Sequence, residues 1–105
     1  MLMRYTNTQE VEVGTAVSGS DEVLYGDFAA GMISVPATSD ITTLTFHVAP
    51  DAGGTYLALT DSSAAAVTLT VAASKAYPIP LEVAGAKAFK MTGNNAGSVT
   101  VNKKS

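Results

Sequence analysis

Apolar and polar residues alternate with a period of two at five places along the chain. Successive side chains of a β-strand point to opposite faces of a sheet, so each alternating set predicts a strand with one buried face. The apolar members of these sets form the predicted core: Leu44, Phe46 and Val48; Val67, Leu69 and Val71; Ile79, Leu81 and Val83; Phe89 and Met91; Val99 and Val101.

Shorter alternating stretches predict four further strands, at residues 11–17, 22–25, 32–35 and 56–59. Segments rich in Gly, Asn, Asp and Ser separate the strands and predict turns. Eight or nine short strands at this spacing indicate an all-β fold, an antiparallel β-sandwich resembling a jelly roll, which forms a single domain over residues 11–105.

Two features fall outside the strand pattern. The Ala-rich stretches 28–31, 64–66 and 72–76 have no apolar stripe long enough for a stable helix, so almost no helix is expected. Residues 1–10 carry no turn signal. This segment is therefore a possible extended N-terminal arm that docks on another molecule.

The composition is that of a folded domain with few charges. Of the 105 residues, 47% are apolar and 14% are charged, against about 25% charged residues in an ordinary soluble protein. Disorder is excluded by this balance. Much of the polar share is threonine, which suits the outer face of a strand.

The chain has no cysteine, which removes disulfides and thiolate metal sites. No apolar run approaches the ~20 residues of a membrane-spanning helix, and residues 1–10 lack the basic start and apolar stretch of a secretory signal. We expect no membrane partner and assembly in the cytoplasm of the host cell.

The charges are divided unevenly along the sequence. Residues 1–61 hold one arginine against eight acidic residues, net −7, whereas residues 62–105 hold five lysines against one glutamate, net +4. A sandwich that interleaves strands from both halves would mix these charges on one surface. Alternatively, the two halves could match head to tail between subunits.

No catalytic pattern emerges, and we expect that the protein is not an enzyme. The only histidine, His47, lies in a predicted strand between Phe46 and Val48. The Ser18-Gly19-Ser20 stretch lacks the G-x-S-x-G spacing of a nucleophile elbow. Acidic residues that could form a carboxylate pair all lie at turns, where they have local backbone roles: Asp21, Glu22, Asp27, Asp51 and Asp61.

The sequence also shows no recognisable site for a cofactor or for nucleic acid. Calcium would suit loop carboxylates, but the EF-hand spacing is absent. No glycine-rich phosphate loop precedes a helix, and no basic cluster exists beyond Lys103-Lys104. We expect no cofactor, no metal and no nucleic-acid partner.

Carbohydrate binding is the alternative from another functional class, because aromatic rings on β-sandwiches can stack on sugars. Trp is absent, and Phe46 and Phe89 fall on core faces. The orientation of the remaining aromatic residues is open between exposed rings and packed ones: Tyr5, Tyr25, Phe28, Tyr56 and Tyr77.

Five consecutive pieces of the sequence resemble small virion proteins of tailed bacteriophages. The pieces share a glycine and apolar pair before Pro-Ala, a threonine-rich strand with Phe, an Asp-Gly-Gly turn that carries an inserted Ala here, a Leu-x-Asp and a valine strand, at residues 31–37, 41–49, 51–56, 59–61 and 67–71. The resemblance implies an antiparallel sandwich or jelly roll within a phage particle. Such modules occur as head decoration (cement) proteins, head fibres, and neck or tail components.

The expected function is therefore that of a capsid decoration protein on the virion surface, which stabilises the head by bridging major capsid subunits. A neck, tail or fibre component is the alternative, and the carbohydrate-binding module remains a further one. We expect a homo-oligomer, with a trimer as the favoured state. Candidate interface residues are Leu2, Arg4, Tyr5, Tyr25, Phe28 and Tyr56.

Overall fold

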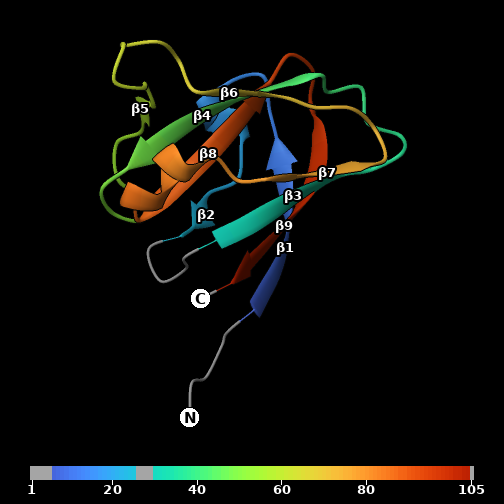
Figure 1. Cartoon of the computed structure of the whole chain (residues 1–105), viewed down its shortest axis with the longest axis horizontal. Coiled ribbons are helices and arrows are strands. Elements are labelled where there is room, and N and C mark those ends of the chain that lie inside the picture. Colours follow the sequence, from blue (N-terminus) through green and yellow to red (C-terminus); the bar gives the residue numbers. More distant parts are fainter. Residues whose placement is uncertain (1–5, 26–29, 105) are drawn as a thin grey trace.

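The computed structural model describes residues 6–25 and 30–104, and within them nine strands form two antiparallel sheets (Figure 1). The first sheet has the order β1 (Thr6–Val13), β9 (Gly97–Lys104), β3 (Ala30–Val35), β7 (Lys75–Pro78). The second has the order β2 (Val23–Leu24), β8 (Ala88–Gly93), β4 (Thr43–Ala49), β5 (Leu57–Ala58), and β6 (Thr68–Thr70) also pairs with β4. The predicted all-β sandwich is confirmed.

The core lies between the inner faces of the two sheets, as the alternation predicted. Leu44 and Phe46 of β4, Phe89 and Met91 of β8, and Val99 and Val101 of β9 are all buried. The rings of Phe46 and Phe89 lie 5.9 Å apart, centroid to centroid. Strands β1 and β3 complete the core with Val11, Val13, Ile33 and Val35.

Strands β5 and β6 are two parts of one edge strand along β4, separated by a protruding loop. Leu59 N–H donates to the Phe46 carbonyl and Phe46 N–H donates to the Val67 carbonyl, so β4 passes directly from β5 to β6. Residues 60–66 form the loop, which Asp61 organises by accepting hydrogen bonds from the N–H groups of Ser63 and Ala65. Asp61 therefore has a local structural role.

The strand predicted over Ile79, Leu81 and Val83 is wrong. Residues Leu81–Gly85 form a 3₁₀ helix, η2, in which the Val83 N–H donates to the Pro80 carbonyl. Pro78 and Pro80 have no N–H to donate, so this run cannot continue a strand ladder. Ile79 and Val83 are buried, but Leu81 is 86% exposed. The strand that forms instead is β7, which the sequence pattern did not indicate.

The expected N-terminal arm is wrong for residues 6–10, and residues 1–5 lie outside the described residues. Strand β1 pairs with β9 from Thr6 opposite Lys104 to Val13 opposite Gly97. The strand expected at 11–17 therefore begins earlier and ends at Val13. The chain then turns through a second 3₁₀ helix, η1 (Val17–Gly19). The helical structure of the described residues consists of these two short 3₁₀ segments.

We expect Gly14→Ala to destabilise the fold by about 1–3 kcal/mol. The added Cβ would lie 2.7 Å from the Gly19 carbonyl oxygen and 2.8 Å from its carbon, and backbone atoms cannot move aside cheaply. Urea denaturation followed by circular dichroism measures the change. Gly19→Ala in the same turn is the control, because its Cβ meets only the Gly14 Cα, at 4.0 Å. Equal losses in the two variants would contradict this packing.

Candidate docking groove

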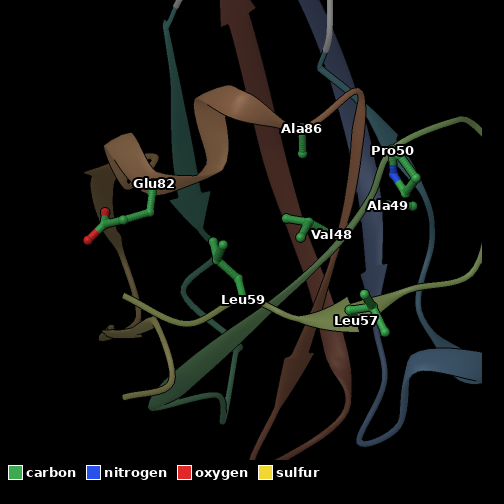
Figure 2. Close-up of a pocket in the computed structure, with 7 residues that line it drawn as sticks. All are labelled: Val48, Ala49, Pro50, Leu57, Leu59, Glu82 and Ala86. Carbon is green, nitrogen blue, oxygen red and sulfur yellow. The ribbon is translucent and has the colours of Figure 1, made fainter. Parts of the chain in front are cut away.

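An apolar groove of about 240 Å³ opens where β4, β5 and η2 meet (Figure 2). Its lining residues come from the end of β4, from β5 and its continuation, and from the η2 segment. They are Val48, Ala49, Pro50, Leu57, Leu59, Glu82 and Ala86. Glu82 supplies the only charged side chain among these described lining residues.

The groove continues the core to the outside of the molecule. Phe89, Val48 and Leu57 face one another across β8, β4 and β5, so all three lie on the inner face of the sheet. Phe89 is fully buried, Val48 is half-buried and Leu57 is 66% exposed. The inner face thus becomes progressively uncovered towards its edge.

The 3₁₀ helix η2 forms the opposite wall of the groove. Val83 is fully buried and anchors η2 in the core. Glu82 and Ala86 then line the groove, and Leu81 beside them is 86% exposed. Leu57 therefore lines the groove with an exposed side chain, and Leu81 is exposed on η2 next to the lining residue Glu82.

The loop of residues 50–56 forms the rim of the groove, and Glu22 holds it in place. The Gly53 N–H donates to Glu22 Oε2 over 2.7 Å, and the Tyr56 hydroxyl donates a short hydrogen bond to the same oxygen. Gly53 has φ +72°, a conformation that favours glycine. Lys90 Nζ lies 5.0 Å from the centre of the Tyr56 ring.

These contacts shift the ionisation of the pair. The hydrogen bond from Tyr56 is the main cause that lowers the pKa of Glu22, followed by the bond from Gly53. Burial raises the pKa of Tyr56, and the hydrogen bond to Glu22 raises it further. Tyr56 therefore remains a neutral donor and Glu22 a charged acceptor at neutral pH. This hydrogen bond holds the loop of residues 50–56 in place.

The predicted interface residues are only partly placed at this site. Leu2, Arg4, Tyr5 and Phe28 lie outside the described residues. Tyr56 is half-buried and supports the rim of the groove. The residues that line the groove were missed as a site: Val48 was predicted as a core residue, and the sequence gives no signal that Leu57 is exposed.

Tyr25 is wrong as an interface residue, because it belongs to the core. Its side chain is 2% exposed and its ring packs edge-to-face on Phe89, with centroids 5.5 Å apart. Burial raises the pKa of its hydroxyl. Tyr25 therefore cannot stack on a sugar. The Tyr77 hydroxyl accepts a hydrogen bond from the Ala72 N–H and has a structural contact of its own.

The residues considered for catalysis have structural contacts. His47 Nε2 lies 3.1 Å from Thr92 Oγ1, and burial lowers the pKa of the imidazole. The Ser20 hydroxyl donates to the Ala16 carbonyl and accepts from the Gly14 N–H. Within the described part of the chain, no group of three His, Asp or Glu side chains could hold a metal ion.

Charges from the two halves of the sequence meet on the same surface. Lys87 lies 3.7 Å from Asp51, and Lys90 lies close enough to Glu22 to lower its pKa slightly. The Lys87–Asp51 pair is exposed and contributes little to stability. It does show that the acidic first half and the basic second half are interleaved here, as expected for a sandwich.

A second, wider hollow of about 540 Å³ lies on the outer face of the first sheet. Its central row consists of one residue from each of the four strands, which face one another: Thr8, Asn102, Met32 and Pro78. Its lining also includes Asn7 and two lysines, so it is more polar than the groove at β5.

Comparison of the chain with protein-family models, with curated proteins and with solved structures gave no match. Among the residues placed by the structure, no helix is long and apolar enough to cross a membrane. The interpretation of the groove therefore depends on its own geometry and chemistry.

We expect Tyr56→Phe to lower the unfolding free energy by about 1 kcal/mol near neutral pH, because Glu22 loses a charge-assisted hydrogen bond. The pKa of Glu22 is below its ordinary 4.5 in the folded protein, so its contribution is present above that pH and disappears as the pH falls through the folded-state pKa. The variant should therefore approach the parent protein in acid. Urea denaturation at a series of pH values measures this.

Tyr77→Phe is the matched control for that experiment. Its hydroxyl bonds a backbone N–H, so its cost should stay constant over the same pH range. A cost of Tyr56→Phe that does not change with pH would contradict the role assigned to Glu22.

Proposed function

We propose that this chain is a structural component of a bacteriophage particle, a capsid decoration (cement) protein that binds the major capsid protein through the groove at β5. The observation that carries the docking role is the exposure of Leu57 in an apolar groove, with Leu81 exposed next to the lining residue Glu82. The assignment to a phage particle is supported by the resemblance of residues 31–71 to small virion proteins.

The size of the groove favours a protein partner over a small molecule. Its volume of about 240 Å³ lies below the ~300–1,000 Å³ of usual small-molecule sites. A space of this size admits one or two apolar side chains of a partner. Exposed leucines around such a pocket are typical of a docking surface, because their burial is favourable by about 1.5–3 kcal/mol each.

The groove also specifies the chemistry of its occupant. The walls are apolar and Glu82 stands at one side. A capsid segment with an apolar anchor residue followed by a lysine or arginine would fill the groove and meet the Glu82 carboxylate. Few other charges would lose water on docking, since charged residues are only 14% of the chain.

A neck, tail or fibre protein would use the same groove against a different virion partner, and it stays the second candidate within this class. The carbohydrate-binding alternative has less support, since Tyr25 is buried and Tyr56 is engaged with Glu22 and Lys90. Assembly in the host cytoplasm and a final place on the capsid surface follow from the proposal.

The test is co-sedimentation of the purified chain with shells assembled from the major capsid protein encoded beside it. We expect saturable binding to the shells. Leu57→Ser and Leu81→Ser should each weaken it at least about tenfold, or about 1.4 kcal/mol. Both side chains are exposed, so the fold should keep its stability within about 0.5 kcal/mol.

Leu24→Ser is the control variant, because Leu24 is 51% exposed but lies on β2, outside the groove. Its binding should equal that of the parent chain. Absence of binding to the shells would exclude the decoration role. Binding that all three variants weaken equally would exclude the groove as the docking site.

A further inference from the structure

The two edges of the first sheet differ in what their backbones offer to a further strand. Antiparallel pairing directs the N–H and C=O groups of alternate residues to opposite sides of a strand. Directly after β7, Ile79 N–H donates to the Gly31 carbonyl of β3, so Pro78 and Ala76 are directed outwards. Pro78 has no N–H, which blocks this edge against another strand.

The edge at β1 is covered only along its second half. The N–H of Glu12 donates to the Asp21 carboxylate, and the carbonyl of Glu12 accepts from the Asp21 N–H. Glu12 is therefore directed away from β9, and alternation places Thr8 and Glu10 in the same orientation. Within residues 6–25 and 30–104, no backbone hydrogen bond to the outward groups of Thr8 and Glu10 is found.

This open half of β1 is long, regular and complementary to itself. It pairs with β9 without a bulge and contains no proline. Two copies that meet about a two-fold axis at Thr8 would pair Thr8 with the partner's Thr8, and Glu10 with the partner's Thr6. All these residues direct their N–H and C=O groups outwards, and no two carboxylates face each other.

We propose that two copies of the chain pair through β1, so that their four-stranded sheets join into one continuous sheet with two-fold symmetry. A like strand-to-strand contact buries the same surface on both partners and closes at two copies. Since Pro78 blocks the other edge, the pairing cannot continue into a fibre. The inference does not rest on the capsid proposal, and it replaces the trimer expected from the sequence.

The first experiment measures the dimer directly with the full chain. Light scattering over a range of concentrations should give a mass that rises from one copy to two and then remains constant. Amide hydrogen exchange should show that the Thr8 and Glu10 N–H groups become protected as the dimer forms. The Asn7 and Gln9 N–H groups, which face β9, should be protected at every concentration.

A charge exchange at position 8 tests the proposed register. Thr8 is exposed, so Thr8→Lys and Thr8→Glu should both fold. Each variant alone places two like charges opposite each other and should dimerise several-fold more weakly. An equal mixture of the two should recover dimers, because lysine then faces glutamate. Thr8→Val, which changes no charge, should dimerise like the parent chain.

Three results would overturn the proposal. The first is a monomer at all concentrations with rapid exchange at Thr8 and Glu10. The second is a trimer, because one strand edge pairs with only one other. The third is a dimer that forms equally well in both charged variants, since that dimer would use another surface. None of these results decides whether a single groove binds the capsid shell, so the two proposals can fail separately.

Discussion

The packing of Phe89 between the two sheets is the interaction on which the remaining structure depends. Its ring contacts Phe46 of the adjacent strand β4 and the edge of Tyr25, and all three side chains are buried. Each such burial is favourable by about 1.5–3 kcal/mol, more than any exposed ion pair of this chain contributes. The groove follows from this packing, because the row through Phe89 and Val48 ends uncovered at Leu57.

The edges of the sheets are the second constraint. A sandwich leaves backbone donors and acceptors unpaired along its outer strands, and each edge must be blocked, covered or paired. Here Pro78 blocks β7 and Asp21 covers part of β1. One edge of the second sheet is split between β5 and β6 by the loop at residues 60–66, and the strand at its other edge, β2, has only two residues, so both leave only short segments for pairing. The open half of β1 is the exception.

The sequence predicted those parts of the fold in which local pattern and packing agree. The alternations around Phe46, Met91 and Val101 gave the correct strands and faces, because buried residues alternate with more exposed ones over residues 43–47, 89–92 and 98–104. The same pattern misled at Ile79 to Val83, where two prolines remove the donors that a strand requires. Lys75–Pro78 has no apolar alternation and pairs only because β3 lies beside it.

The site was less predictable than the fold, for a physical reason. The exposure of Leu57 depends on how far other segments of the chain cover the inner face of the second sheet. Those segments are distant from Leu57 in the sequence, so its neighbours do not reveal its exposure. Tyr25 shows the same effect in reverse. It follows the two-residue strand β2, too short for an alternation to orient its ring, and only Phe89 on β8 determines that it is buried.

The two proposed contact surfaces lie on different parts of the molecule, and this separation has a consequence for affinity. Strand β5 ends the second sheet and β1 ends the first, and Figure 1 shows them far apart. Pairing through β1 would therefore leave the groove of each copy open. If the decoration role holds, a dimer that carries two grooves would engage a repetitive shell at two points, and its second contact would form at a high effective concentration. The dimer would then bind an ordered lattice of capsid subunits with high affinity, although each groove alone binds a free subunit only weakly.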